Sequence, residues 1–128
     1  MINKDLIGRE SEPVINRIEA ESVRRFAEAI DAPNVEDVPP TFVMTLRSGI
    51  IPGLELPEKG LIHARQQFTY YQQIAIGDVV SCTRRIADIF ERRGGLGLMT
   101  FVVQEMTGRN IAGDLVFTAT STLIAREG

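Results

Sequence analysis

The chain has 128 residues, of which 44% are hydrophobic and 24% are charged, and its formal net charge at pH 7 is −3. This length predicts one domain over residues 1–128, and the slightly acidic balance argues against a general nucleic-acid binder. The sequence has no apolar run of the ~20 residues that cross a bilayer and no apolar signal region at its start. A single cysteine, Cys82, and a single histidine, His63, exclude an internal disulfide and argue against a metal cluster. We therefore expect a reduced, cytoplasmic protein that binds neither nucleic acid nor membrane.

The first half of the chain predicts two helices. In Glu19–Asp31, apolar residues recur at i, i+3, i+4 and i+7 from Val23 onward, so one stripe faces a core. Pro33 ends this helix, because proline disfavours a helical residue before it. A shorter helix is predicted over Thr41–Arg47, with the Pro-Pro pair at 39–40 in its first turn. Glycines and prolines then mark residues 49–60 as irregular.

From Leu61 onward, the apolar period changes to two residues, which predicts strands. Arg92–Gly97 reads as a glycine-rich hairpin turn and Gly108–Asp114 as a longer turn. A helix followed by long antiparallel strands indicates an α+β fold in which the sheet wraps the helix. The predicted strands are Leu61–Tyr71, Val79–Arg92, Leu96–Thr107 and Leu115–Arg126.

Several of these segments resemble a known family. The stretch Leu61-Ile-His-Ala-Arg-Gln-Gln-Phe-Thr-Tyr70, followed by Ile76-Gly-Asp-Val-Val80, is similar to MaoC-like dehydratases and more specifically to the FAS1-like dehydratase N-terminal domain. The helix Val23–Ile30, Pro39-Pro-Thr-Phe42 and the final Ala119-Thr-Ser-Thr-Leu-Ile124 match in the same order. The likeness runs from about residue 7 to the end. It implies a single hot-dog fold, an antiparallel β-sheet wrapped around a central α-helix.

The resemblance also implies a function. Members interconvert a (3R)-3-hydroxyacyl thioester and the trans-2-enoyl thioester plus water. The thiol is coenzyme A or the phosphopantetheine of an acyl carrier protein, and no other cofactor is implied. Hot-dog units pair, so a homodimer or a heterodimer with another hot-dog subunit is expected, with an acyl tunnel between the units.

One segment departs from the family pattern. Relatives hold an Asp and a His on the loop after the first helix, in a pattern like Gly-Asp-x-Asn-Pro-x-His. When this pattern is aligned with residues 31–37, the sequence keeps the asparagine as Asn34. Ala32 occupies the position of the aspartate, and Asp37 occupies the position of the histidine. The usual dyad is therefore missing. Activity is expected to need a partner subunit that carries the dyad, or a non-standard site.

Three residues are candidates for catalysis: His63, Asp31 and Asp37. His63 is the one side chain whose ordinary pKa lies near neutrality. A histidine on a strand also serves often as a structural residue. Asp31 at a helix end and Asp37 in a loop read more simply as solvated carboxylates, and we favour that interpretation.

Four residues are candidates for substrate binding: Asn34, Gln67, Arg84 and Arg85. Asn34 is either an amide donor to the thioester carbonyl or a turn residue. Either Gln67 or its neighbour Gln66 orients the thioester, or both are only polar side chains of the strand. The arginines suit coenzyme A phosphates or an acidic carrier protein, although solvated arginines on sheet faces are common. Cys82 lies in an apolar strand and is not expected to be a nucleophile.

Two rival functions fit the same scaffold. One is an acyl-thioester hydrolase, for which a carboxylate or a held water near the carbonyl is sufficient. The other is a non-catalytic, substrate-holding subunit of a hetero-oligomer. Fold alone does not choose among these functions.

Overall fold

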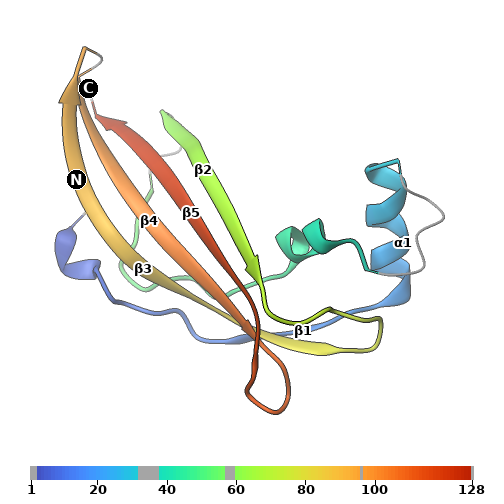
Figure 1. Cartoon of the computed structure of the whole chain (residues 1–128). Helices are drawn as coiled ribbons and strands as arrows, with labels where there is room; N and C mark the ends of the chain where they lie inside the picture. Colours follow the sequence, from blue (N-terminus) through green and yellow to red (C-terminus); the bar gives the residue numbers. More distant parts are fainter. Residues whose placement is uncertain (1–2, 32–37, 57–59, 96, 128) are drawn as a thin grey trace.

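The computed structural model describes residues 3–31, 38–56, 60–95 and 97–127, and its strands form one antiparallel sheet in the order β1-β3-β4-β5-β2 (Figure 1). Within these described residues, one α-helix, α1, and two short 3-10 helices, η1 and η2, accompany the sheet. The expected α+β fold with an antiparallel sheet is confirmed. The elements are η1 (Lys4–Leu6), β1 (Val14–Arg17), α1 (Ala20–Ala29), η2 (Pro40–Thr45), β2 (Leu61–Tyr70), β3 (Val79–Gly94), β4 (Gly97–Arg109) and β5 (Leu115–Glu127).

The predicted elements are found with small shifts, and one of them changes type. Helix α1 and strands β2 to β5 lie within a few residues of their predicted bounds. The segment predicted as a second α-helix is instead the 3-10 helix η2, in which Phe42 N donates to Pro39 O and Leu46 N donates to Val43 O. A segment of six residues closes few i to i+4 hydrogen bonds, and 3-10 turns are frequent in such short pieces. Strand β1 and η1 were not predicted.

The sheet has two chemically different faces, which the strand register defines. Cys82, Gly108 and Phe117 lie opposite one another on β3, β4 and β5, and all three are buried. Paired residues in an antiparallel sheet share a face, and alternate residues share it along each strand. We call the face with Cys82 and Phe117 the inner face. The opposite, outer face carries Thr83 of β3, its partner Thr107 of β4, and the residues that alternate with them along these strands.

The inner face is covered by α1, η2 and residues 46–56. Two groups of buried side chains fill this layer, and in Figure 1 the helices lie on this side of the sheet. The first group joins the helices to the end of the sheet near β1, and the second joins η1 and residues 51–56 to the middle of the sheet. The first contains Ile18, Val23, Val38, Phe42, Val43, Ile74, Val80, Cys82, Val116, Phe117 and Ala119, and the second contains Leu6, Ile51, Ile86, Ile89, Val102 and Ala125.

Two contacts hold the covering segment in place. The Asn16 side chain on β1 donates to Arg47 O at 2.8 Å and accepts from Arg47 N at 2.8 Å, so the residue after η2 is fixed to the sheet edge. Gly49 passes so close to the backbone that a Cβ there would lie 2.5 Å from Glu12 O. A side chain at position 49 would therefore push the covering segment away from the sheet.

The substitution Gly108→Ala is expected to lower the free energy of unfolding by about 1–3 kcal/mol, the usual cost of overpacking a filled core. An added Cβ at position 108 would lie 2.2 Å from the ring of Phe117, which is 0% exposed and has little room to move. Urea denaturation followed by circular dichroism measures the change.

Gly95→Ala is the matched control, because no atom lies within 4 Å of a Cβ at position 95. Equal unfolding midpoints for Gly108→Ala and the unchanged protein would contradict the packing of Phe117 over Gly108.

Candidate functional site

In the described part of the chain, a pair of adjoining clefts lies between the inner face of the sheet and its covering segment. The smaller, of about 80 Å³, lies under η2, and the larger, of about 310 Å³, lies under residues 48–56. Both are lined by Arg84 of β3 and Gln104 of β4. We call the pair the inner cleft, and its two shared residues mark its centre.

The floor of the inner cleft is a polar row that crosses three strands. Gln104 pairs with Ser121 of β5, which pairs with Gln66 of β2, so all three side chains point to the inner face. Gln104 is only 5% exposed. The cover is apolar, with Val43, Met44 and Leu46 over one cleft and Ile51, Leu54 and Leu56 over the other. The cleft therefore combines hydrogen-bonding groups on one wall with hydrocarbon on the other.

Arg84 was predicted as a substrate-binding residue, and it lies at the inner cleft. It pairs with Met106 and stands between Cys82 and Ile86, which are both fully buried. The Arg84 side chain is partly buried. Among the described residues that line the two clefts, it is the one charged group.

His63 lies on the same face as Arg84 but at the open edge of the sheet. It pairs with Leu123, which pairs with the buried Val102, so its position is an inner-face one. A register shift between His63 and Arg65 makes Gln66 the next inner-face residue along β2. His63 is exposed, and three strand spacings of about 4.8 Å separate it from β3. It does not line the inner cleft, to which β2 contributes Gln66 and Phe68.

Gln67 and Arg85 occupy the opposite side of the sheet from Arg84. Gln67 pairs with Thr120, Thr120 with Glu105 and Glu105 with Arg85, which forms one row on the outer face. The Arg85 guanidinium lies 3.5 Å from the Glu105 carboxylate. The structure therefore does not bring these two predicted residues to the inner cleft.

Asp31 ends helix α1 in a left-handed conformation. Its φ is 60°, and its backbone N donates to Glu28 O at 3.1 Å. Its side chain is exposed. Figure 1 shows this end of α1 well away from the start of β2, the strand that carries His63. The other loop predictions, Asn34 and Asp37, lie outside the described residues.

Sequence reasoning missed three polar residues of the inner cleft: Gln104, Ser121 and Ser48. The Ser48 hydroxyl is buried without a hydrogen-bond partner and lines the larger cleft. Gln104 had a usable signal, because it interrupts an apolar strand run at a position whose alternation predicts burial. Ser48 had none, since its place depends on how residues 46–56 cross the sheet.

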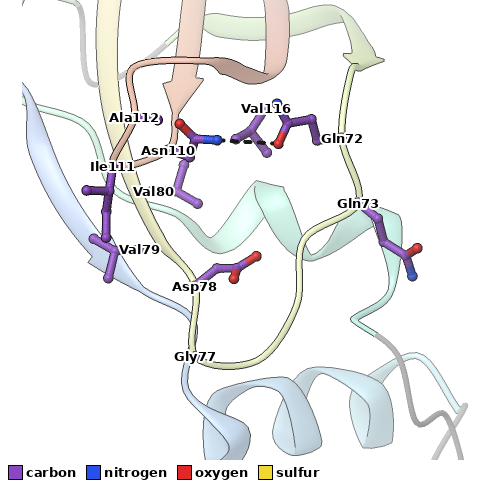
Figure 2. Close-up of a pocket in the computed structure, with 10 residues that line it drawn as sticks. All are labelled: Gln72, Gln73, Gly77, Asp78, Val79, Val80, Asn110, Ile111, Ala112 and Val116. Atoms are coloured by element: carbon purple, nitrogen blue, oxygen red, sulfur yellow. Dashed lines mark hydrogen bonds between the residues drawn. The ribbon is translucent and has the colours of Figure 1, made fainter.

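A second cleft, of about 330 Å³, lies at the end of the sheet between the β2–β3 connection and the β4–β5 turn (Figure 2). The Asn110 amide donates to Gln72 Oε1 at 3.4 Å, and Asp78 Oδ2 accepts from Ala75 N at 2.8 Å. Figure 2 shows Gln73 pointing away from the other side chains. The bond between Asn110 and Gln72 ties the two connections together, and the bond between Ala75 and Asp78 lies within the β2–β3 connection. None of the predicted site residues that the structure describes lines this cleft.

Cys82 is buried and chemically protected. Burial raises the pKa of its thiol to about 12, and a side-chain hydrogen bond with Asn16 offsets part of that rise. The described residues contain no group of three His, Cys, Asp or Glu side chains that could hold a metal ion. None of the helices in the described part of the chain is long and apolar enough to span a membrane.

Solved structures identify the class of fold. The chain superposes on the HadBC (3R-hydroxyacyl-ACP dehydratase) complex of Mycobacterium tuberculosis with a TM-score of 0.71, at 21% identity, over 94% of this chain and 98% of that one. It superposes on a MaoC-like dehydratase of Rhodospirillum rubrum with a TM-score of 0.69, at 17% identity, over 100% and 98% of the two chains. The fold is therefore the hot-dog fold, as the resemblance implied.

Sequence comparison identifies the family. The model of the FAS1-like dehydratase domain region matches residues 5–119. A UPF0336 protein of Thermobifida fusca (strain YX) is 31% identical, and the match covers 98% of this chain and 94% of that protein. This chain belongs to the family of the FAS1-like dehydratase domain region.

The Cys82 thiol is expected to react with a disulfide reagent at pH 8 at least about a thousandfold more slowly than a free thiol, because a rise of three pKa units lowers the thiolate fraction about a thousandfold. The native protein should also lose stability as the pH rises from about 9 toward 12, since the unfolded thiol ionises first. Reaction with Ellman's reagent and denaturation at several pH values measure the two effects.

The control is Ala112→Cys in a Cys82→Ser background, because Ala112 is exposed in the β4–β5 turn. Similar reaction rates for the native Cys82 and the control cysteine would show that the thiol is accessible, against its burial.

Proposed function

We propose that this chain is an acyl-thioester-binding hot-dog subunit that takes part in the interconversion of a (3R)-3-hydroxyacyl thioester and the trans-2-enoyl thioester plus water. The observation that carries the proposal is the family match over residues 5–119. The inner cleft supports it, because an acyl group suits the apolar cover and a thioester carbonyl suits amide donors such as Gln66.

We propose further that the working form contains a second hot-dog subunit. Strand β2 has ten residues and a single neighbour in the sheet, β5, and nearly all its side chains are exposed. An unpaired edge strand of this length is a ready surface for another sheet. The HadBC protein, which shares the fold, is itself a complex. A heterodimer would bring a complete acid/base pair to a chain whose own residues 31–37 lack the family's pattern.

In this proposal His63 handles a proton at the open edge of the inner face. It lies on β2, so a partner that pairs with this strand would come close to it. Asp31 and Asp37 remain candidates for a supporting carboxylate, and Asn34 for an amide donor to the thioester carbonyl. Gln67 and Arg85 face outward, where they suit the carrier portion of the thioester better than the acyl group.

The purified chain is expected to bind crotonyl-coenzyme A but to hydrate it slowly, and a hot-dog subunit with an intact Asp/His pair should restore hydration. Hydration is followed as loss of absorbance of the conjugated thioester, and hydrolysis as appearance of free thiol. Free thiol from the chain alone would favour the hydrolase. Absence of both binding and restored hydration would contradict the proposal.

His63→Ala is expected to lower kcat of the active complex at least about 100-fold, the smaller end of the usual contribution from a positioned acid or base. Arg65→Ala is the matched control, because Arg65 pairs with Thr122 on the outer face of the same strand. Steady-state rates over a pH series separate loss of a titrating group from loss of binding.

Asp31→Asn tests the carboxylate without changing the backbone, since asparagine tolerates the left-handed conformation at this position. Unchanged rates in both His63→Ala and Asp31→Asn would remove these two residues from the catalytic site.

A further inference from the structure

The charged residue at the centre of the inner cleft lacks a partner. Within the described part of the chain, the Arg84 side chain forms no ion pair, and its recorded hydrogen bonds are made by its backbone N and O with Ser11. Most arginines of the described chain are exposed, and the other partly buried one, Arg85, is paired with Glu105. Because withdrawing a guanidinium from water is costly, a partly buried one without a partner indicates that an anion from outside the chain completes the site.

The groups around Arg84 also favour an oxyanion. Gln104 is 5% exposed and lines both clefts, and the buried Ser48 hydroxyl in the larger cleft has no hydrogen-bond partner. Gln66 and Ser121 add an amide and a hydroxyl to the smaller cleft. None of the described lining residues is a carboxylate, so an incoming negative charge meets no repulsion there.

The size and cover of the cleft limit the kind of anion. The larger cleft has a volume of about 310 Å³ and is covered by Ile51, Leu54 and Leu56. Such a space takes a short alkyl chain. A phosphate group carries about two charges and is strongly hydrated, and one arginine under an apolar cover compensates it poorly. A carboxylate carries one charge, and its planar shape matches the guanidinium fork.

We infer that the inner cleft is a carboxylate-binding subsite, and that the acyl group this chain holds ends in a carboxylate that pairs with Arg84. This inference rests on the proposed acyl-thioester binding and names its substrate class, a thioester of a short dicarboxylic acid. Gln104 and Ser48 would contribute hydrogen bonds to the same carboxylate, and the apolar cover would contact the methylene groups.

The test compares two coenzyme A thioesters of equal chain length, adipoyl-coenzyme A and hexanoyl-coenzyme A, by isothermal titration calorimetry on the full chain. Adipoyl-coenzyme A should bind about tenfold more tightly or better, the usual range for a charge-assisted pair. Arg84→Met should remove this preference, and Arg84→Lys should reduce it, since lysine keeps the charge but loses the fork. Arg65→Met is the matched control, because Arg65 lies on the outer face of β2, and it should keep the preference.

The outcomes distinguish a failure of the carboxylate subsite from a failure of the proposed thioester binding. Equal affinity for the two thioesters, or a preference that survives in a folded Arg84→Met protein, overturns the carboxylate subsite and leaves thioester binding intact. Binding of neither thioester overturns the proposed function. Free hexanoate and its neutral analogue hexanamide then test the subsite alone: hexanoate binding that depends on Arg84 supports it, and equal or absent binding of the two overturns it. Circular dichroism of each variant confirms that it is folded.

Discussion

The packing of Phe117 over Gly108 is the contact on which the rest of the inner layer depends. The aromatic ring is fully buried and occupies the volume that a side chain at position 108 would need. Around it lie residues from every element that covers this end of the sheet, including Val23 of α1 and Phe42 of η2. The position of η2 in turn fixes where residues 46–56 begin their path across the sheet. The walls of the inner cleft therefore depend on a contact that lies outside the cleft.

Much of the fold could be predicted, because the signals for α1 and for the four long strands are local. Residues 19–31 keep the 3.6-residue period of a helix over several turns, and the segments after residue 61 keep the two-residue period of strands over several residue pairs. The predicted ends of these elements therefore differ only slightly from the observed ones. Strand β1 was missed because its four residues, Val14–Arg17, read apolar, apolar, polar, polar without a two-residue period, and they follow a proline. It becomes a strand by pairing with β3, which is a long-range contact. The type of η2 was missed because helical spacing over six residues does not distinguish a 3-10 helix from an α-helix.

The candidate site was less predictable, for a physical reason that Gln66 and Gln67 illustrate. Alternation shows that two neighbouring residues face opposite sides, but the choice of the buried side depends on the register with the next strand. On an edge strand such as β2, where nearly every side chain is exposed, burial gives no signal about this choice. The two neighbouring arginines of β3 present the same difficulty. Ser48 depends on Gly49 and Glu12, which are distant in the sequence from the strands that form the cleft floor.

The opposite orientation of Arg84 and Arg85 also limits how sequences of this family can change in length. A single residue inserted or deleted within β3, between its pairing with β1 and position 84, would exchange the two side chains between faces. Arg85, which now pairs with Glu105, would then face the inner side and Ile86 would turn outward, while Cys82, which pairs with β1, would keep its face. Insertions and deletions should therefore concentrate in the turns at 94–97 and 110–114, where added residues leave the strand register unchanged. A length difference inside β3 between two relatives would be a sign that their clefts present different chemistry.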